Sequence, residues 1–394
     1  AIPAAPQANP LHSGGVIDLD GDFRGADVRW SWQPAALELS VGLSADEQDQ
    51  RRRGFENFIG DQLGVRGALR RDERNRVNNL DGYAQLMWPL GSSWNLSAGL
   101  RHSRVRFRVD DDYQHAGNPD DSGQRAYSAL TPVAGALYRA TPRLHLYASV
   151  GEGFETPTFA ELGYRPDGGS GLNFSLAPAR SRNAELGAKW RWADAGHAEL
   201  ALFRADSRDE LAVASNAGGR SSYRNVGQAR RQGAELSLDW TFASVWQLEL
   251  AATWLQARFR SPLLACSGTP CTSPNTPVAA GARIPGVPEA WWHMELARGG
   301  DLGWRASLRA DGVAAVTVND IGSARAPGYQ LLGLQLAHGW ALRQGHLRAF
   351  ARLDNLFDRA YVGSVIVNDG NARYYEPGPG RGVLLGLRWS GSTR

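Results

Sequence analysis

Six residues between the apolar stretches of this chain combine aromatic rings with charge. A guanidinium group grips carboxylates through two parallel hydrogen bonds and stacks on flat rings, while aromatic faces attract cations. Such a set could close over a planar, anionic ligand, although packing within a loop is the simpler role for any single member. The candidate ligand-binding residues are Phe154, Glu155, Tyr164, Arg165, Tyr223 and Arg224.

The two cysteines, Cys266 and Cys271, lie in the segment CSGTPC. The proline and glycine between them make a disulfide geometrically feasible, and a bridged loop indicates an oxidising compartment. Two thiols without a nearby histidine make a poor metal site. We therefore expect a disulfide, no metal and no cofactor.

Other reactive groups give weaker signals. The segment 110–121 carries five aspartates and could bind calcium, but a solvated acidic loop is the simpler reading. The eight histidines are scattered. Since no nucleophile elbow is present, we expect no enzyme activity.

The segments that must position these groups alternate apolar and polar residues. In residues 182–192, one face carries Ala184, Leu186, Ala188, Trp190 and Trp192, and the other carries Glu185, Gly187, Lys189 and Arg191. Residues 234–241, 245–254 and 382–389 repeat the pattern. Period-two alternation with one wholly apolar face predicts strands between two different environments, either in a sandwich or in a membrane barrel.

The connections between about fifteen such segments alternate short with long, as in an up-and-down barrel of an outer membrane. We predict tight turns near residues 33–35, 90–93, 141–143, 194–196, 243–244, 298–301 and 343–345. The long connections are expected at residues 48–78, 110–125, 155–181, 216–222, 261–288, 318–326 and 362–371. Eleven of the tryptophans lie near the tight turns, which predicts an aromatic belt at one membrane interface.

Composition excludes two classes of protein. No run of eighteen or more apolar residues exists, so the chain is not a helical membrane protein. The net charge is +3, with Lys+Arg 43 against Asp+Glu 40, and no basic tract suggests nucleic acid. Arginine runs such as Arg51–Arg53 and Arg104, Arg106 and Arg108 are expected in loops or on the lumen face. Arginines near the outer leaflet could also pair with lipopolysaccharide phosphates.

Several stretches resemble TonB-dependent outer-membrane receptors. The segment LYASVGEGFETPTFAEL and the strand after it match the family pattern at Gly153, Phe154, Pro157, Thr158, Glu161, Leu162, Pro178, Glu185, Gly187 and Lys189. A second stretch matches at Asn225, Gly227, Gly233 and Glu235. LDNLFDRAYVG resembles the penultimate strand, and residues 382–389 end in an aromatic, as final strands of the family do. The segments ETPTFAELGYRPDG and GLNF are also similar to the YncD-like branch.

The resemblance implies an all-β, antiparallel, up-and-down transmembrane β-barrel of 22 strands with an N-terminal plug domain. Only about fifteen strands are visible, so we expect an incomplete barrel that lacks the plug. We expect a linker at residues 1–21, a partial barrel at 22–390 and a tail at 391–394. The first strand, at 22–33, and the last, at 382–389, should be edges without their normal partners.

The resemblance also implies a function, namely TonB-dependent uptake of a scarce ligand through the bacterial outer membrane, with a ferric siderophore as the expected ligand. Implied partners are the TonB–ExbB–ExbD complex, reached through the missing N-terminal region, and lipopolysaccharide around a monomer. Haem is disfavoured because GFETP replaces the histidine-containing loop of haem receptors. The alternatives are a non-iron ligand such as pyrroloquinoline quinone, or a passive porin or adhesion barrel.

Overall fold

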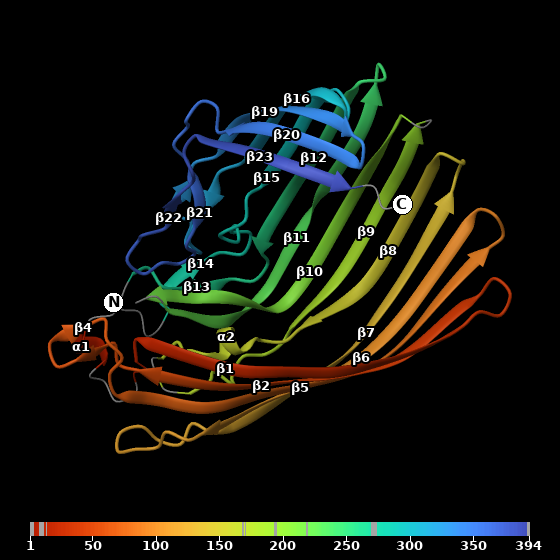
Figure 1. The fold of residues 1–394 in the computed structure, drawn as a ribbon. Helices are drawn as coiled ribbons and strands as arrows, with labels where there is room; N and C mark the ends of the chain where they lie inside the picture. Colours follow the sequence, from red (N-terminus) through yellow and green to blue (C-terminus); the bar gives the residue numbers. More distant parts are fainter. Residues whose placement is uncertain are drawn as a thin grey trace.

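The computed structural model describes residues 4–7, 12, 14–167, 169, 171–192, 195–217, 220–268 and 274–391. Fifteen strands form one antiparallel sheet in which every strand pairs with its neighbours in chain order. The sheet curls around the segments that connect its strands (Figure 1). None of the helices in these described ranges is long and apolar enough to cross a membrane.

Long strands build the sheet because their alternating residues suit its two faces. In order they are β1 (Val16–Trp32), β2 (Glu38–Phe55), β5 (Leu69–Leu90), β6 (Trp94–Asp111), β7 (Gly123–Arg139), β8 (Leu144–Glu155), β9 (Ala179–Trp192), β10 (Gly196–Ala217), β11 (Arg220–Phe242), β12 (Trp246–Phe259), β15 (Ala290–Arg298), β16 (Gly303–Val313), β19 (Tyr329–Leu342), β20 (Gly345–Asp354) and β23 (Gly382–Gly391).

The remaining elements lie in the connections. Four small hairpins pair β3 (Phe58–Ile59) with β4 (Gln62–Leu63), β13 (Leu263–Ala265) with β14 (Thr276–Val278), β17 (Val316–Thr317) with β18 (Arg325–Ala326), and β21 (Val362–Val365) with β22 (Tyr375–Pro377). Two helices of one turn, α1 (Ala4–Gln7) and α2 (Phe159–Leu162), complete the fold. The expected fold class and number of sheet strands are confirmed.

The two faces of the sheet have opposite chemistry. On the outer face, Leu186 is 58% exposed and Leu387 is 76% exposed, as expected for side chains that meet lipid. On the inner face, the Tyr147 hydroxyl donates to Glu185 at 2.7 Å. A Cβ at Gly187 would stand 2.4 Å from the Tyr147 ring, so this glycine makes room for a large inner side chain.

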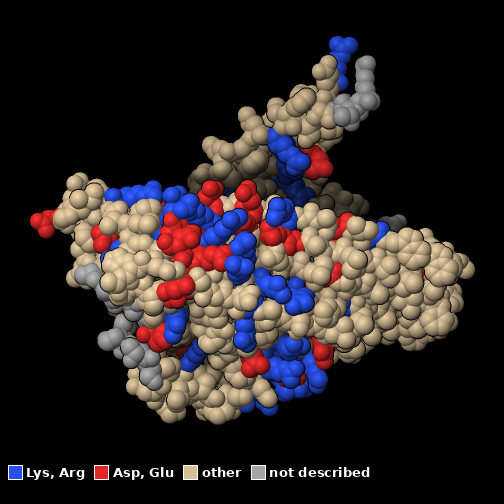
Figure 2. Space-filling model, turned by 90° about the horizontal axis from the view of Figure 1, so that it is seen from below, with Lys and Arg blue, Asp and Glu red and all other residues tan. Residues whose placement is uncertain are grey.

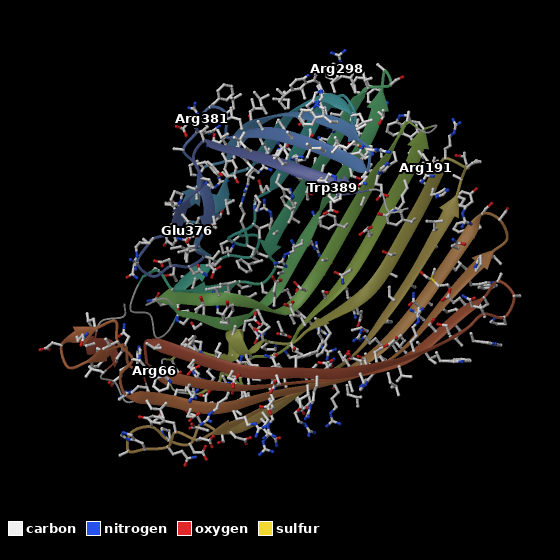
Figure 3. The ribbon with its side chains drawn as sticks, viewed as in Figure 1. Arg66, Arg191, Arg298, Glu376, Arg381 and Trp389 are labelled. Carbon is white, nitrogen blue, oxygen red and sulfur yellow. The ribbon has the colours of Figure 1, made fainter. Side chains whose placement is uncertain are left out.

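The tight turns gather at one end of the sheet, which we call the turn end, and the long connections gather at the other, the loop end (Figure 1). Arg191 and Arg298 mark the turn end, whereas Arg66, Glu376 and Arg381 mark the loop end (Figure 3). The aromatic residues predicted beside the tight turns do gather at the turn end. The centres of the Trp190 and Trp192 rings are 4.9 Å apart, and those of Trp192 and Trp240 are 6.4 Å apart.

Several strands continue beyond their predicted bounds at the loop end. The expected connection at residues 48–78 is wrong, because β2 runs to Phe55 and β5 starts at Leu69. Likewise β10 and β11 pair as far as Ala217 and Arg220, so the expected connection at 216–222 lies largely within strands. β1 starts at Val16 and not at Asp22. The extensions of β2 and β5 are mostly polar on both faces, so they show little apolar alternation. The extension of β1 does alternate, since Ile17 and Leu19 lie between aspartates.

Among the described strands, β1 pairs only with β2, and β23 pairs only with β20. The expectation that the first and last strands are edges is therefore confirmed. The tail residues 392–394 and Asp194 of one predicted turn lie outside the described residues. The division of the chain into a linker, a barrel and a tail stays a prediction.

Candidate functional site

The connection between β8 and β9, residues 156–178, is held by its own helix. Thr158 caps α2, and its hydroxyl accepts from the Glu161 N–H at 3.3 Å. The Glu161 carboxylate in return accepts from the Thr158 N–H at 2.8 Å, which completes a capping box. Leu162 is fully buried. The family-like residues of this segment therefore fix the shape of the connection.

An apolar cluster attaches this connection to the strands. Leu162, Leu172 and Leu176 pack against Phe107, Val109 and Tyr127 of β6 and β7. Asn225 of β11 clamps its last part, because the side-chain amide donates to the Ala177 carbonyl at 2.8 Å and accepts from the Ala177 N–H at 2.7 Å. The connection thus lies over the inner face at the loop end.

The same connection also contacts a distant strand of the sheet, at Arg52 on the inner face of β2. An Arg52 amine donates to the Tyr164 hydroxyl at 3.2 Å, and its guanidinium carbon lies 5.5 Å from the centre of that ring. Among the described residues, no carboxylate is within ion-pair distance of Arg52. Its neighbour Arg71 repels it electrostatically and is itself paired with Glu73.

Arg52 is therefore a half-buried cation on the inner face, without an ion-pair partner of its own among the described residues. Nearby on β5, Asn75 is 1% exposed, and neither atom of its amide has a partner among the described residues. An unpaired buried amide is costly, so Asn75 has hydrogen-bonding capacity that none of the described residues uses.

The hairpin of β10 and β11 separates two groups of loops. Asp209 has a φ of 54°, which breaks the alternation of β10, so Ser207 and Glu210 lie on one face and bond at 2.7 Å. Beyond this point, Leu211 and Tyr223 pack on the cluster around Leu162. On the other face, Ala212 and Val226 pack on a second cluster that contains Phe259, Val278 and Ile284.

Arg224 belongs to this second side. It donates to buried Asp320 at 2.7 Å and also to the Leu264 carbonyl. Asn368 donates to the same Asp320 oxygen at 3.1 Å and to the Val213 carbonyl at 2.8 Å. Burial raises the pKa of Asp320, while Arg224 and Asn368 oppose this rise. These contacts join three loops, and we call the group of Arg224, Asp320 and Asn368 the clasp.

The structure brings only some of the predicted site residues together. Phe154 and Tyr223 pack on the Leu162 cluster, and Tyr164 meets Arg52. Glu155 is exposed at the end of β8. Arg165 is exposed and donates to Asp167 at 3.1 and 2.7 Å, which holds the pKa of Asp167 below its ordinary value. Arg224 faces away from this group, so the six residues form no single pocket.

Only one of the two cysteines belongs to the described residues. Cys266 follows β13, but Cys271 lies outside the described residues, so their disulfide stays a prediction. In the acidic segment, Asp110 pairs with Arg76 and Arg108, and Asp111 accepts from the Tyr113 N–H at 3.0 Å. No group of three or more potential metal ligands occurs within the described ranges.

Sequence reasoning missed Arg52 and Asp320. Arg52 stood in a run of three arginines expected in a loop or on the lumen face, and it was not chosen as a site residue. Alternation places it on the face opposite Arg51 and Arg53 once the strand is extended. Asp320 gave no signal because its partners are 96 and 48 positions away in the chain.

The comparisons with known proteins agree on one family. Residues 7–356 match the family model for the TonB dependent receptor-like beta-barrel. The metal-pseudopaline receptor CntO of Pseudomonas aeruginosa (strain UCBPP-PA14) is 26% identical over 337 residues, covering 80% of this chain and 42% of the receptor. The chain therefore spans less than half the length of this relative.

Solved structures show the same fold. The siderophore receptor PiuA from Acinetobacter baumannii superposes with a TM-score of 0.75 at 15% identity, covering 94% of this chain and 56% of that one. The copper transporter OprC gives a TM-score of 0.73 at 18% identity over the same shares of 94% and 56%.

Proposed function

The chain belongs to the family of TonB-dependent receptor β-barrels of the bacterial outer membrane, and we propose that it carries an anionic metal chelate, a ferric siderophore in particular, across that membrane. The relatives named above are a metal-pseudopaline receptor, a siderophore receptor and a copper transporter, which supports this ligand class. The energy source proposed is the TonB–ExbB–ExbD complex. A monomer surrounded by lipopolysaccharide is the proposed state in the membrane.

The observation that carries the proposal is the environment of Arg52. Its guanidinium points to the inner face, is held by Tyr164 of the 156–178 connection and has no carboxylate within ion-pair distance among the described residues. A carboxylate or catecholate ligand would supply the missing negative charge and could bind through two parallel hydrogen bonds.

The residues expected from the sequence enter with different roles. Tyr164 positions Arg52, and Phe154 and Tyr223 support the connection by packing. Arg165 contributes only when a ligand displaces Asp167. Arg224 shapes the neighbouring loops, and Glu155 has no proposed contact. Because these residues lie at the loop end, that end is the proposed entrance for the ligand.

Uptake of radioactive iron tests the ligand class. The intact protein is expressed in a bacterial host whose own ferric receptors are deleted, with ferric citrate and ferric enterobactin as anionic probes. The cationic ferrioxamine B is the matched control. We expect accumulation of at least one anionic chelate and none in a host without TonB. Uptake without TonB would indicate a passive barrel, and uptake of pyrroloquinoline quinone alone would indicate the non-iron ligand.

Substitution of Arg52 tests the site itself. Arg52→Gln should lower the apparent affinity for the transported chelate roughly 10- to 100-fold, because a hydrogen bond to a charged group is worth about 1.5–3 kcal/mol. Arg53→Gln is the control: Arg53 is the adjacent arginine but points outward and pairs with Asp18 at 3.0 Å. Equal effects of both substitutions would contradict the proposed site.

A further inference from the structure

The apolar residues of β1 change face along the strand. Near the turn end, Trp30 points outward like the apolar residues of the neighbouring strands. Toward the loop end, Ile17, Leu19 and Phe23 occupy the alternate positions, so they point to the inner face. The register agrees, because Leu19 stands directly opposite Arg52. These three residues, which we call the shelf, make the inner face of β1 apolar where the lumen of such a barrel is normally polar.

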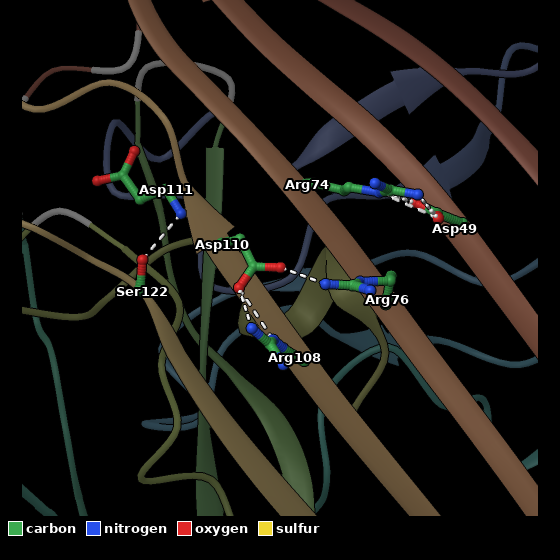
Figure 4. A network of polar contacts seen from close by, with 7 residues as sticks. All are labelled: Asp49, Arg74, Arg76, Arg108, Asp110, Asp111 and Ser122. Atoms are coloured by element: carbon green, nitrogen blue, oxygen red, sulfur yellow. Dashed lines mark hydrogen bonds and ion pairs between the residues drawn. The ribbon is translucent and has the colours of Figure 1, made fainter.

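The outward side of the same region is charged. Figure 2 shows charged residues gathered over the middle of the outer face, beside an uncharged region at the turn end. On β1 the charge comes from aspartates, of which Asp18 accepts from Arg53 at 3.0 Å. On β2 and β5 the ion pairs continue with Asp49 and Arg74 at 2.5 Å (Figure 4). The shelf is therefore not part of the face that meets lipid.

The arginines of β6 also belong to this outward side. The predicted placement of Arg104, Arg106 and Arg108 in loops or on the lumen face is wrong, because they share the outer face of β6 with Leu100. Arg108 pairs there with Asp110 at 2.9 Å (Figure 4). These three guanidinium groups therefore do not reach the surface beside the shelf.

Inward apolar side chains are covered on β6 but open on β1. Phe107 of β6 packs in the cluster around Leu162 and is 3% exposed. Phe23 lies in the same row of directly opposed residues, three strands away, yet it is 72% exposed. Leu19 is 55% exposed. Among the described residues, the connection 156–178 thus covers one part of the inner apolar surface and leaves the shelf open.

Polar groups without partners stand beside the shelf on the inner face of β2. Gln48 lies directly opposite Phe23, and Arg52 lies directly opposite Leu19. Between them, Gln50 points the same way. Both glutamines are half-buried, and within the described ranges their amides have no hydrogen-bond partner. An apolar strip on β1 and a row of amide and guanidinium groups on β2 thus run side by side, about 4.8 Å apart.

We propose that the shelf selects, among anionic metal chelates, those whose metal-binding groups are aromatic rings joined through amides. This inference rests on the proposed function and names the substrate class within it. The rings lie on Leu19 and Phe23, where contact between rings adds to apolar burial. The amides bond to Gln48 and Gln50, and an anionic group reaches Arg52. Four residues of a strand span about 13 Å, so one chelate with several rings contacts the whole strip.

The cation beside the shelf decides between possible occupants. A purely apolar segment of polypeptide on the shelf would also bury the Arg52 guanidinium and the neighbouring amides without partners, which is costly. A chelate without rings would pair with Arg52 but leave Phe23 in water. An aromatic, amide-containing anion satisfies both parts of the surface.

Binding of radioactive iron chelates to outer membranes that contain the intact protein tests this selection. The probes are ferric enterobactin, whose catechol rings are joined through amides, and ferric citrate, which is anionic and has no ring. We expect tighter binding of ferric enterobactin. Leu19→Ala/Phe23→Ala should weaken that binding roughly 25-fold, since each apolar contact contributes about fivefold, and should leave ferric citrate binding unchanged. Phe23→Trp keeps a ring and should bind normally. The control Phe357→Ala removes an equally exposed ring, 72%, from the turn after β20 and should have no effect.

Chemical labelling shows what covers the shelf. The thiol of Phe23→Cys should react with a charged maleimide in the absence of chelate, and ferric enterobactin should protect it while ferric citrate at the same concentration does not. The parent chain gives the background from its own cysteines. A thiol that is unreactive without chelate would mean that polypeptide covers the shelf, which overturns the inference.

The binding results separate this inference from the proposed function. Ferric citrate bound as tightly as ferric enterobactin, or equal losses of both chelates in Leu19→Ala/Phe23→Ala, would overturn the role of the shelf and leave the proposed function standing. Failure of the parent protein to bind either chelate would overturn the proposed function and the inference with it.

Discussion

Neighbouring residues of identical chemistry have different roles here because a strand sends them to opposite faces. Arg51 and Arg53 point outward and pair with Asp72 and Asp18. Arg52 points inward, contacts Tyr164 and has no carboxylate partner among the described residues. An exposed pair on the outer face is replaceable at little cost, whereas the inner guanidinium is available for a ligand. The side on which an arginine stands decides its role.

The clasp of Arg224 and Asp320 yields a prediction at this scale. Arg224→Met leaves the buried Asp320 carboxylate without its cation, which should cost roughly 3–5 kcal/mol in the opening of the loops. Hydrogen exchange should accelerate in residues 318–324 and 366–371, and strands far from the clasp should keep their rates. The double variant Arg224→Met/Asp320→Leu should recover much of the protection, because an apolar pair of similar volume leaves no buried charge. If hydrogen exchange in these loops is as fast in the double variant as in Arg224→Met, the proposed role of the Arg224–Asp320 pair is contradicted.

At the scale of elements, the family-like residues act as braces for the loops. Pro157 and Leu162 are buried, Thr158 and Glu161 cap α2, and Asn225 holds Ala177 from a neighbouring strand. The polar atoms of Thr158 and Glu161 bond to each other, and the Asn225 amide bonds to Ala177. The pattern that identifies the family therefore fixes how the 156–178 connection is mounted, while residues outside the pattern, such as Tyr164, face Arg52.

The capping box can be tested directly. Thr158→Ala removes the acceptor for the Glu161 N–H, which should cost about 1 kcal/mol and speed amide exchange in α2 roughly fivefold. Thr158→Ser keeps a hydroxyl in place and should behave like the parent chain. Unchanged exchange in Thr158→Ala would mean that packing of Leu162 alone holds the helix.

The loop between β12 and β15 carries the expected bridge between Cys266 and Cys271. Mass measurement without reductant should give a value two hydrogens lower than that of the reduced chain. Alkylation before reduction should label neither thiol. Two freely alkylated thiols would exclude the bridge and leave the β13–β14 hairpin held by its three residue pairs.

Alternation, connection lengths and tryptophan positions were enough to predict the sheet, its order and its turn end. The prediction failed where those signals stop. Beyond the apolar band both faces of β2 and β5 are mostly polar, so the pattern ended although the hydrogen-bonded ladder continued. The candidate site was predicted less well, because Arg52 meets Tyr164 across 112 positions of the chain. Only the folded sheet defines that distance.

On the scale of the whole molecule, the sheet has two open edges among its described strands. Every second residue of an edge strand directs its N–H and carbonyl away from its only neighbour. In β1 these groups lie beside Val28, Trp30 and Trp32, within the apolar band. Unpaired backbone groups cost several kcal/mol each in hydrocarbon, so the edges are the least stable part of the sheet.

Hydrogen exchange of the 394-residue chain in detergent micelles should reveal this gradient. Amides of residues 22–32 in β1 and of 383–390 in β23 should exchange at least about tenfold faster than those of β6, because a strand paired on one side opens without breaking a second ladder. β5 and β6 serve as the internal control, since both are paired on two sides. Equal protection of β1 and β6 would mean that the edges have found a partner. A change of that protection with protein concentration would then identify the partner as a second copy, and constant protection would identify it as the other edge of the same sheet.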